Sequence, residues 1–333
     1  MAPSVWITLT RPRLPYIFSL TFCPPATVHD PIAGTMRVFS WYRFGVEDTF
    51  DPQYKFVSSP FLSPYVLAGI RTLLALYSLC TVCTVLAFDV SMGLGKSFLS
   101  YFTLLSYIGL TSYYWAAAVQ TFFYARYGRY PLRRWPRLLQ GLHVLLQSTI
   151  TVFPFIVTII FWAILSSSQT FATTLDAWEN ISIHAMNSAF ALFEILFSNS
   201  PPAPWLMIPF QILMLCGYLA VAYITHVTQG FYTYSFLDPA NGGGQLAGYI
   251  IGIAVGDVLL FAIARGVAVL RQRYALRSGR LAKGDGDGLG GSAEAIDEWQ
   301  EIERPVAGGK KEQGEGEAPR VTDSGLGAEA EAV

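Results

Sequence analysis

The sequence predicts an all-α fold, a polytopic membrane helix bundle with about six transmembrane helices and a disordered C-terminal tail. Hydrophobic residues make up 53% of the chain and charged residues 14%, whereas soluble domains carry about 25% charged residues. Ionisable residues are scarce between about Ser63 and Leu270 and dense near the C-terminus. A bilayer accommodates such long apolar stretches, because each helical crossing needs roughly 20 apolar residues.

Six stretches are apolar over the length of a membrane crossing. They cover residues 65–88, 100–123, 142–165, 181–198, 204–226 and 246–270. The fourth stretch is the shortest and most polar. Pro154 lies in the third and is expected to kink it, because proline removes an intrahelical hydrogen bond. The expected organisation is an N-terminal cytoplasmic segment (1–62), a transmembrane domain (63–270), and a basic juxtamembrane stretch with a disordered tail (271–333).

The distribution of Arg and Lys predicts that both termini face the cytoplasm. The loop between the first two spans carries only Lys96, and the loops after the third and fifth spans carry neither residue. Three clusters of cations fall on the other side, at Arg11, Arg13, Arg37, Arg43 and Lys55, at Arg126, Arg129, Arg133, Arg134 and Arg137, and at Arg271, Arg273, Arg277 and Arg280. We therefore expect an integral protein of the endomembrane system or plasma membrane.

Several other classes of function are disfavoured by the sequence. The N-terminal apolar run is broken by prolines and lacks a clear cleavage site, so it is not a convincing signal peptide. Cys80 and Cys83 form a C-x-x-C inside an apolar span, without a partner cysteine or His nearby in the sequence, and are interpreted as helix-packing residues. Beyond Arg280, low hydrophobicity and abundant Gly, Glu and Lys predict disorder. We expect no metal, no cofactor and no nucleic-acid partner.

Polar residues inside the spans are the candidate functional residues, because they are costly in a bilayer and usually face the bundle interior. They fall at Thr103 with Ser106 and Tyr107, at His184 with Asn187, Ser188 and Glu194, at His226, and at Asp257. With the predicted orientation, Thr103, His184 and His226 lie at one depth near the non-cytoplasmic surface. His184, Asn187, Ser188 and Glu194 also share one helical face, which is expected to line a cavity.

A Thr hydroxyl beside an imidazole can perform acyl transfer, with the His accepting the proton as the hydroxyl attacks a carbonyl. Either His184 or His226 lies at the depth that this base requires. Glu194 is about 15 Å below His184 on a regular helix, so it is expected to bind a cation or backbone groups instead. Asp257 lies near mid-bilayer, too far from Arg265 for a direct pair.

The segment KSFLSYFTLLSYIGLTSYYW resembles the "YLT-[FN]" segment of the androgen-induced and androgen-dependent TFPI-regulating proteins, and ENISIHAMNSAFALFEILFS resembles their "H-x-x-N-[ST]-x-x-x-x-x-[DE]" helix. Rolling-stone-like membrane proteins share a similar pattern. The likeness spans roughly 65–270. It implies an integral-membrane threonine hydrolase that cleaves fatty-acid esters of hydroxy fatty acids, with Thr103 as nucleophile and His184 as base. Leu104 and Leu105 depart from the family pattern, which affects the expected substrate.

Three functional hypotheses follow. The first is a lipid-ester hydrolase that uses Thr103 and His184 near the lumenal leaflet, with membrane lipids and a lipid ester as its partners. The second is a non-enzymatic scaffold or receptor-like protein whose tail recruits protein partners. The third is a transporter or channel that uses Glu194 and Asp257.

Overall fold

The computed structural model describes residues 40–280, which are helical and contain no strand. The predicted disorder of the tail and most of the expected N-terminal segment lie outside the described residues. The principal helices are α1 (Pro64–Ser91), α2 (Phe102–Tyr127), α3 (Arg137–Ile150), α4 (Phe153–Ile160), α5 (Thr174–Ile181), α6 (Asn187–Phe197), α7 (Met207–Gln229) and α8 (Gly243–Arg277). Short π-helical turns continue α4 (Phe161–Leu165) and join α5 to α6 (Ser182–Met186).

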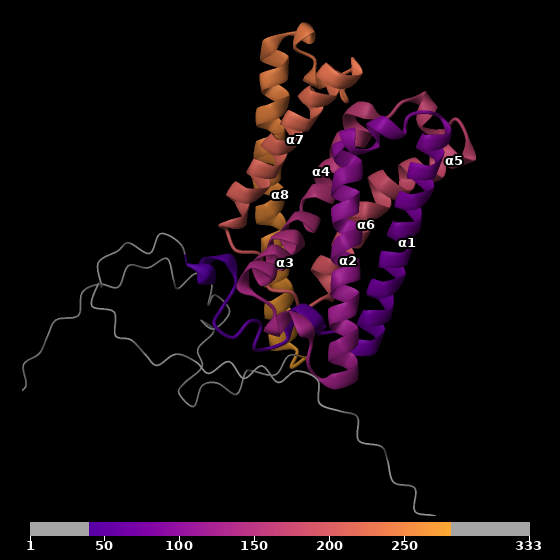
Figure 1. Ribbon diagram of the computed structural model, residues 1–333. Coiled ribbons are helices and arrows are strands. Elements are labelled where there is room, and N and C mark those ends of the chain that lie inside the picture. The colour runs from indigo at the N-terminus through magenta and orange to yellow at the C-terminus, as the bar shows by residue number, and fades with distance from the viewer. Residues whose placement is uncertain (1–39, 281–333) are drawn as a thin grey trace, which may run out of the picture. The chain divides into compact units, whose positions relative to one another are not determined.

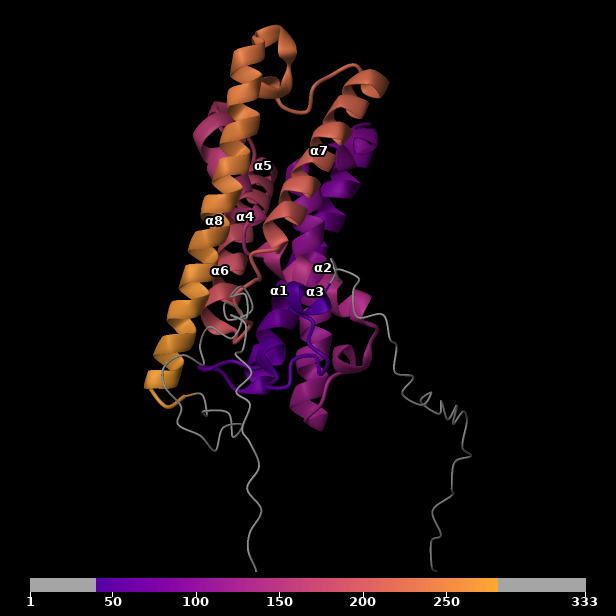
Figure 2. The same ribbon diagram turned by 90° about the vertical axis from the view of Figure 1, so that its left-hand side faces the viewer.

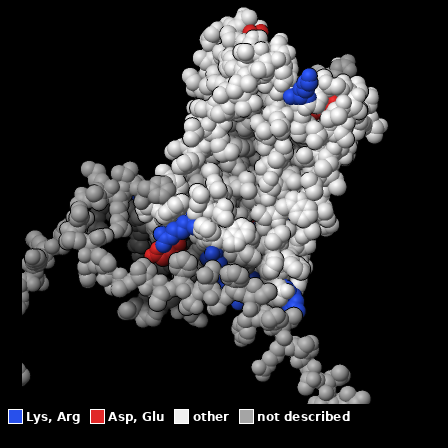
Figure 3. Space-filling model, viewed as in Figure 1, with Lys and Arg blue, Asp and Glu red and all other residues white. Residues whose placement is uncertain are grey.

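Four helical stretches are long and apolar enough to cross a membrane. They are Pro64–Ser91, Arg137–Leu165, Met207–Gln229 and Gly243–Arg277. Between Trp41 and Arg280 the chain runs back and forth, so that the α1–α2 and α7–α8 connections lie at one end and the α2–α3 connection at the other (Figures 1 and 2). On the face drawn in Figure 3, charged side chains gather near the two ends and uncharged residues cover the surface between them. The predicted all-helical, membrane-compatible fold is thus confirmed.

Local sequence explains where the helices begin and end. The Ser63 hydroxyl accepts the Val66 amide at the start of α1, and Pro64 occupies the first turn, where no amide donor is needed. α2 and α7 are followed directly by Gly128 and Gly230, whose φ angles of 68° and 81° lie in the left-handed region that glycine tolerates.

The third apolar stretch, where a kink at Pro154 was predicted, is divided into two helices. α3 ends at Ile150, and α4 begins at Phe153 with Pro154 in its first turn. Thr151 and Val152 form a turn between them. Because proline has no amide hydrogen, it is tolerated in a first turn and disfavoured in a helix interior. The proline therefore divides this stretch into two helices.

A fully buried ion pair joins α1 to α6. Arg71 and Glu194 are both 0% exposed and form a bidentate contact. The carboxylate also accepts the Tyr113 hydroxyl at 2.8 Å, while Arg71 donates to the Phe56 carbonyl at 2.9 Å and to Thr121 Oγ1 at 2.6 Å. Such complete pairing is what a buried charge requires. Glu194 thus has the cationic partner expected for it, supplied by a residue of the first apolar stretch.

Residues 41–62 pack against the ends of α2 and α3 through a buried carboxyl, Asp51. Its side chain accepts the amides of Lys55 at 2.6 Å and Phe56 at 3.1 Å, and the Tyr130 hydroxyl at 2.5 Å. Burial raises the pKa of Asp51, and these hydrogen bonds oppose that change. Burial raises the pKa of the Tyr130 phenol, and the neighbouring Asp51 carboxylate raises it further.

Candidate functional site: an apolar cavity at the start of α2

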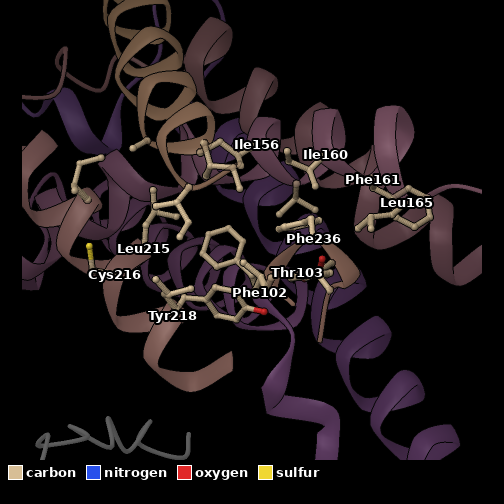
Figure 4. Close-up of a pocket in the computed structure, with 18 residues that line it drawn as sticks. Phe102, Thr103, Ile156, Ile160, Phe161, Leu165, Leu215, Cys216, Tyr218 and Phe236 are labelled. Carbon is tan, nitrogen blue, oxygen red and sulfur yellow. The ribbon is translucent and has the colours of Figure 1, made fainter. Parts of the chain in front are cut away.

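A cavity of about 120 Å³ lies among α2, α4, α7, α8 and the 234–237 segment (Figure 4). Its lining is almost entirely apolar, and the residues labelled in Figure 4 include Phe102, Ile156, Ile160, Leu215 and Phe236. The aliphatic hydroxyl in this lining belongs to Thr103. A concave apolar site with few polar groups is the usual form of a small-molecule or lipid site.

Thr103 is the second residue of α2 and is 8% exposed. No side chain caps this helix, and the amides of a first turn have no intrahelical acceptor. The phenol of Tyr234 lies beside the Thr103 hydroxyl and the backbone of Phe102 and Thr103. Burial raises the pKa of Tyr234, and these contacts offset part of the increase. The Thr hydroxyl therefore lies beside the positive end of a helix dipole, at the edge of an apolar space.

The segment that follows α7 is held against the start of α2 by hydroxyl groups. Tyr218 donates to the Ser100 carbonyl at 3.2 Å and shares a hydrogen bond of 3.0 Å with Thr233. Thr225 donates to the Ser100 hydroxyl at 2.9 Å. The loop that bears Tyr234 is thus held close to Thr103. The amino-acid composition of this loop does not predict the contact.

His184 lies in the π-helical turn between α5 and α6 and is buried, with 8% of its surface exposed. Its imidazole stacks on the Phe161 ring, with centroids 3.6 Å apart and planes inclined by 13°. Trp162 donates to the His184 carbonyl at 3.0 Å. The Phe161 ring also lines the Thr103 cavity, whereas His184 does not. Among the described residues, no hydrogen bond joins Thr103 to His184.

The predicted polar face of α6 is buried, but it contacts α4 and does not line the cavity. Asn187 and Ser188 donate to the Pro154 carbonyl at 3.3 and 3.0 Å. Thr158 donates to Asn187 Oδ1 at 3.1 Å and lies 2.7 Å from the Ser188 hydroxyl. These hydrogen bonds join α6 to the first two turns of α4, directly after the interruption between α3 and α4.

The other predicted residues lie outside the cavity lining. Ser106 donates to the Thr103 carbonyl at 3.0 Å, and Tyr107 is buried in the apolar cluster between α1 and α2. The His226 imidazole stacks on Tyr232, with ring centroids 3.9 Å apart. His226 therefore lies against the loop after α7, and among the described residues no hydrogen bond joins it to Thr103.

Sequence reasoning did not select Phe161, Tyr234 or Arg71. A lone Arg inside the first apolar stretch is a signal that would have identified Arg71. Nothing in the sequence distinguishes Phe161 or Tyr234 from the many other aromatic residues. The described residues contain no cluster of three or more potential metal ligands. Cys80 and Cys83 are free and exposed.

Comparisons of the chain with protein-family models, with curated proteins and with solved structures found no match. The arrangement of the residues themselves is therefore the basis for a functional proposal.

Proposed function

We propose that the protein is a membrane-embedded lipid-ester hydrolase in which Thr103 is the nucleophile. The observation that carries this proposal is the position of the Thr103 hydroxyl, which lies at the edge of an apolar cavity and at the N-terminus of α2. The cavity accepts an acyl chain, and the hydroxyl lies where the ester carbonyl would be held. The likeness of residues 65–270 to the androgen-induced and androgen-dependent TFPI-regulating proteins suggests esters of hydroxy fatty acids as substrates.

The proposal includes six membrane crossings with both termini in the cytoplasm. The two crossings beyond the four apolar helices are α2 and the continuous rod Thr174–Phe197. Polar groups lower the hydropathy of both, but these groups lie largely inside the bundle, as Tyr113, Thr121 and Glu194 do. Six crossings also place the Arg-rich α2–α3 connection and the end of α8 on the same side, as the positive-inside rule requires.

In the proposed reaction the Thr103 oxygen attacks the ester carbonyl while its proton passes to the His184 imidazole. The carbonyl π electrons move onto oxygen, which the first-turn amides of α2 and the Tyr234 hydroxyl stabilise. Collapse of this intermediate breaks the bond to the alcohol, which leaves with the proton from His184. Water then attacks the acyl-threonine by the same path, releasing the fatty acid and restoring the hydroxyl.

Phe161 lies between the cavity and His184, so proton transfer requires this ring to rotate out of its stack on the imidazole. Rotation is a small motion for an aromatic side chain at a cavity wall, and catalytic contacts often form only when substrate is bound. The acyl chain would occupy the cavity and displace the ring. Substrate binding would thereby bring the base to the nucleophile.

The test is covalent labelling of the membrane-inserted protein by a fluorophosphonate probe, which reacts with activated hydroxyls. We expect labelling of the wild type and loss of labelling in Thr103→Ala and His184→Ala. Thr111→Ala is the matched control, because this hydroxyl lies on the same helix and only donates to the Tyr107 carbonyl at 2.9 Å. Labelling that persists in Thr103→Ala, or that is absent from folded wild type, would refute the proposed nucleophile.

A further inference from the structure

A second, smaller cavity lies where α8 meets the connection between α6 and α7. Its volume is about 20 Å³, and its lining includes two arginines of α8, Arg265 and Arg271. Both lie inside the protein, with 6% and 7% of their surface exposed. A charge at this level of burial needs partners, because an uncompensated charge in an apolar interior is strongly unfavourable. The neighbours of the two arginines therefore indicate what the cavity can hold.

Both arginines bind backbone oxygens of the last turn of α6 and of the connection that follows it. Arg271 donates to the Ile195 carbonyl through Nη1 and to the Ser200 carbonyl through Nη2. Arg265 donates to the Ala203 carbonyl at 2.7 Å. The Nε–H group of Arg271 is buried and has no acceptor among the described residues. Arg271 is thus bound by neutral oxygens and has one donor that is not used.

The carboxylate that lines this cavity is already paired. Glu194 forms the bidentate contact with Arg71 and accepts the Tyr113 hydroxyl at 2.8 Å. Asp257, the carboxyl group of α8, is buried without a hydrogen-bond partner among the described residues. It does not line the cavity, and on a regular helix it lies about 21 Å along the axis from Arg271. The lining therefore has two positive charges, and its one negative charge is shared with a third arginine.

Gln147 of α3 adds a side-chain amide to the same lining. Its side chain is 5% exposed, and its Oε1 accepts no hydrogen bond within the described part of the chain. A carboxamide that rotates about its last bond presents either its oxygen or its NH₂ group. The NH₂ group of Gln147 and the Nε–H group of Arg271 are therefore two donors that one negatively charged occupant can use.

The volume of the cavity restricts the occupant to a small ion. A space of about 20 Å³ holds one particle of the size of a water molecule. A chloride ion is only slightly larger than water, whereas phosphate, sulfate and lipid headgroups are several times larger. A metal cation is disfavoured by the two positive charges of the lining, and it would need several oxygen ligands around it. The site matches a halide ion in both charge and size.

We propose that the small cavity is a binding site for a chloride ion, which accepts a hydrogen bond from Arg271 and holds the end of α8 against the α6–α7 connection. The ion offsets the charge of Arg271 and so stabilises the folded state, and no covalent bond forms or breaks. A ligand that binds only the folded protein raises the unfolding midpoint as its concentration increases. The two cavities share no lining residue, so this inference is independent of ester hydrolysis.

The test is the thermal unfolding midpoint of the full-length protein, extracted and purified in detergent with sodium gluconate. Sodium chloride then replaces the gluconate at constant sodium concentration. For wild type we expect a rise of about 3–6 °C at a chloride concentration about ten times the dissociation constant. Sodium bromide should act like sodium chloride, because bromide has the same charge and a similar size. Gluconate is too large for the cavity.

Two pairs of variants locate the ion. Arg271→Met removes the charge and should lose the dependence on chloride, whereas Arg273→Met, an exposed position on the same helix, should respond like wild type. Gln147→Glu places a carboxylate at the site of the ion, so it should lose the dependence and unfold at a higher temperature than wild type in gluconate. Gln245→Glu adds the same charge at an exposed position of α8 and should keep the dependence.

A wild-type midpoint that is the same in chloride and in gluconate would overturn the proposal and assign the cavity to water alone. A response to chloride of wild-type size in folded Arg271→Met or in Gln147→Glu would also overturn it, because the ion would then bind elsewhere. If Arg271→Met does not elute as a folded protein, Gln147→Glu decides the question, since it keeps the arginine and nearly the shape of the glutamine.

Discussion

Replacing Glu194 by Gln tests whether the buried pair with Arg71 is structural. The substitution keeps the shape of the side chain and removes its negative charge. Arg71, which is 0% exposed, is then left with a positive charge in the bundle interior. A guanidinium cannot release its proton to become neutral. The partners of Arg71 are then the amide oxygen at position 194, one backbone carbonyl and the Thr121 hydroxyl, which are all neutral and do not compensate the charge.

The expected cost is about 3–5 kcal/mol, the usual result of removing one partner of a buried pair. At roughly 2–4 °C per kcal/mol, the midpoint of thermal unfolding should fall by about 6–20 °C. Arg71→Met should cost less than Glu194→Gln, because an unpaired Glu can take up a proton. The double variant should also be more stable than Glu194→Gln alone, since it contains no unpaired charge.

These midpoints can be measured in one detergent by fluorescence-detected size-exclusion chromatography after heating. Asp48→Asn serves as a control for the loss of a negative charge, because the Asp48–Arg137 pair lies at the surface and such pairs contribute about 0–1 kcal/mol. If Glu194→Gln unfolded at the same temperature as wild type, the reasoning would be refuted. Simple addition of the two single effects in the double variant would refute it as well.

Two further predictions concern other parts of the molecule. Because burial raises the pKa of Asp51, the folded state holds this proton more tightly than the unfolded chain, so the contribution of Asp51 to stability is greatest below about pH 4 and declines as the pH rises through the folded value. The unfolding midpoint of Asp51→Asn should therefore show a smaller decline over that range in a pH series, and an unchanged profile would contradict this. Phe161→Ala should label faster with the fluorophosphonate probe, because it opens the path between Thr103 and His184, while it costs about 3–5 kcal/mol of stability. Slower labelling of the folded variant would argue against the ring as a barrier.

The helices were predictable from sequence because membrane crossings impose length, apolarity and charge asymmetry on each segment separately. The break near Pro154 follows from the chemistry of one residue. Hydropathy is less informative for α2, where Tyr113, Tyr114 and Gln120 are buried against neighbouring helices. The polarity of these side chains lowers the apolar signal of a helix whose polar groups face inward.

The site was harder to predict, because its geometry depends on departures from regular structure. The expected common face of His184 and Asn187 assumed an unbroken α-helix, but the π-helical turn Ser182–Met186 rotates His184 relative to α6. The imidazole consequently stacks on Phe161. Tyr234 reaches Thr103 from a loop, and a single sequence contains no information about such contacts between distant segments.

The Arg71–Glu194 pair also has a consequence for biosynthesis, because 123 positions separate its members along the chain. A charged residue costs about 2.5–3.5 kcal/mol at the centre of an inserted helix, and this value is an upper bound for Arg71, which lies about two turns from the start of α1 and is unfavourable there until it finds a partner. At about 5–20 residues per second, the ribosome needs roughly 6–25 s to reach Glu194 after it has made Arg71. During this interval α1 should remain beside the translocon or an insertion chaperone, so crosslinking of stalled nascent chains should capture α1 there until the α6 segment has emerged.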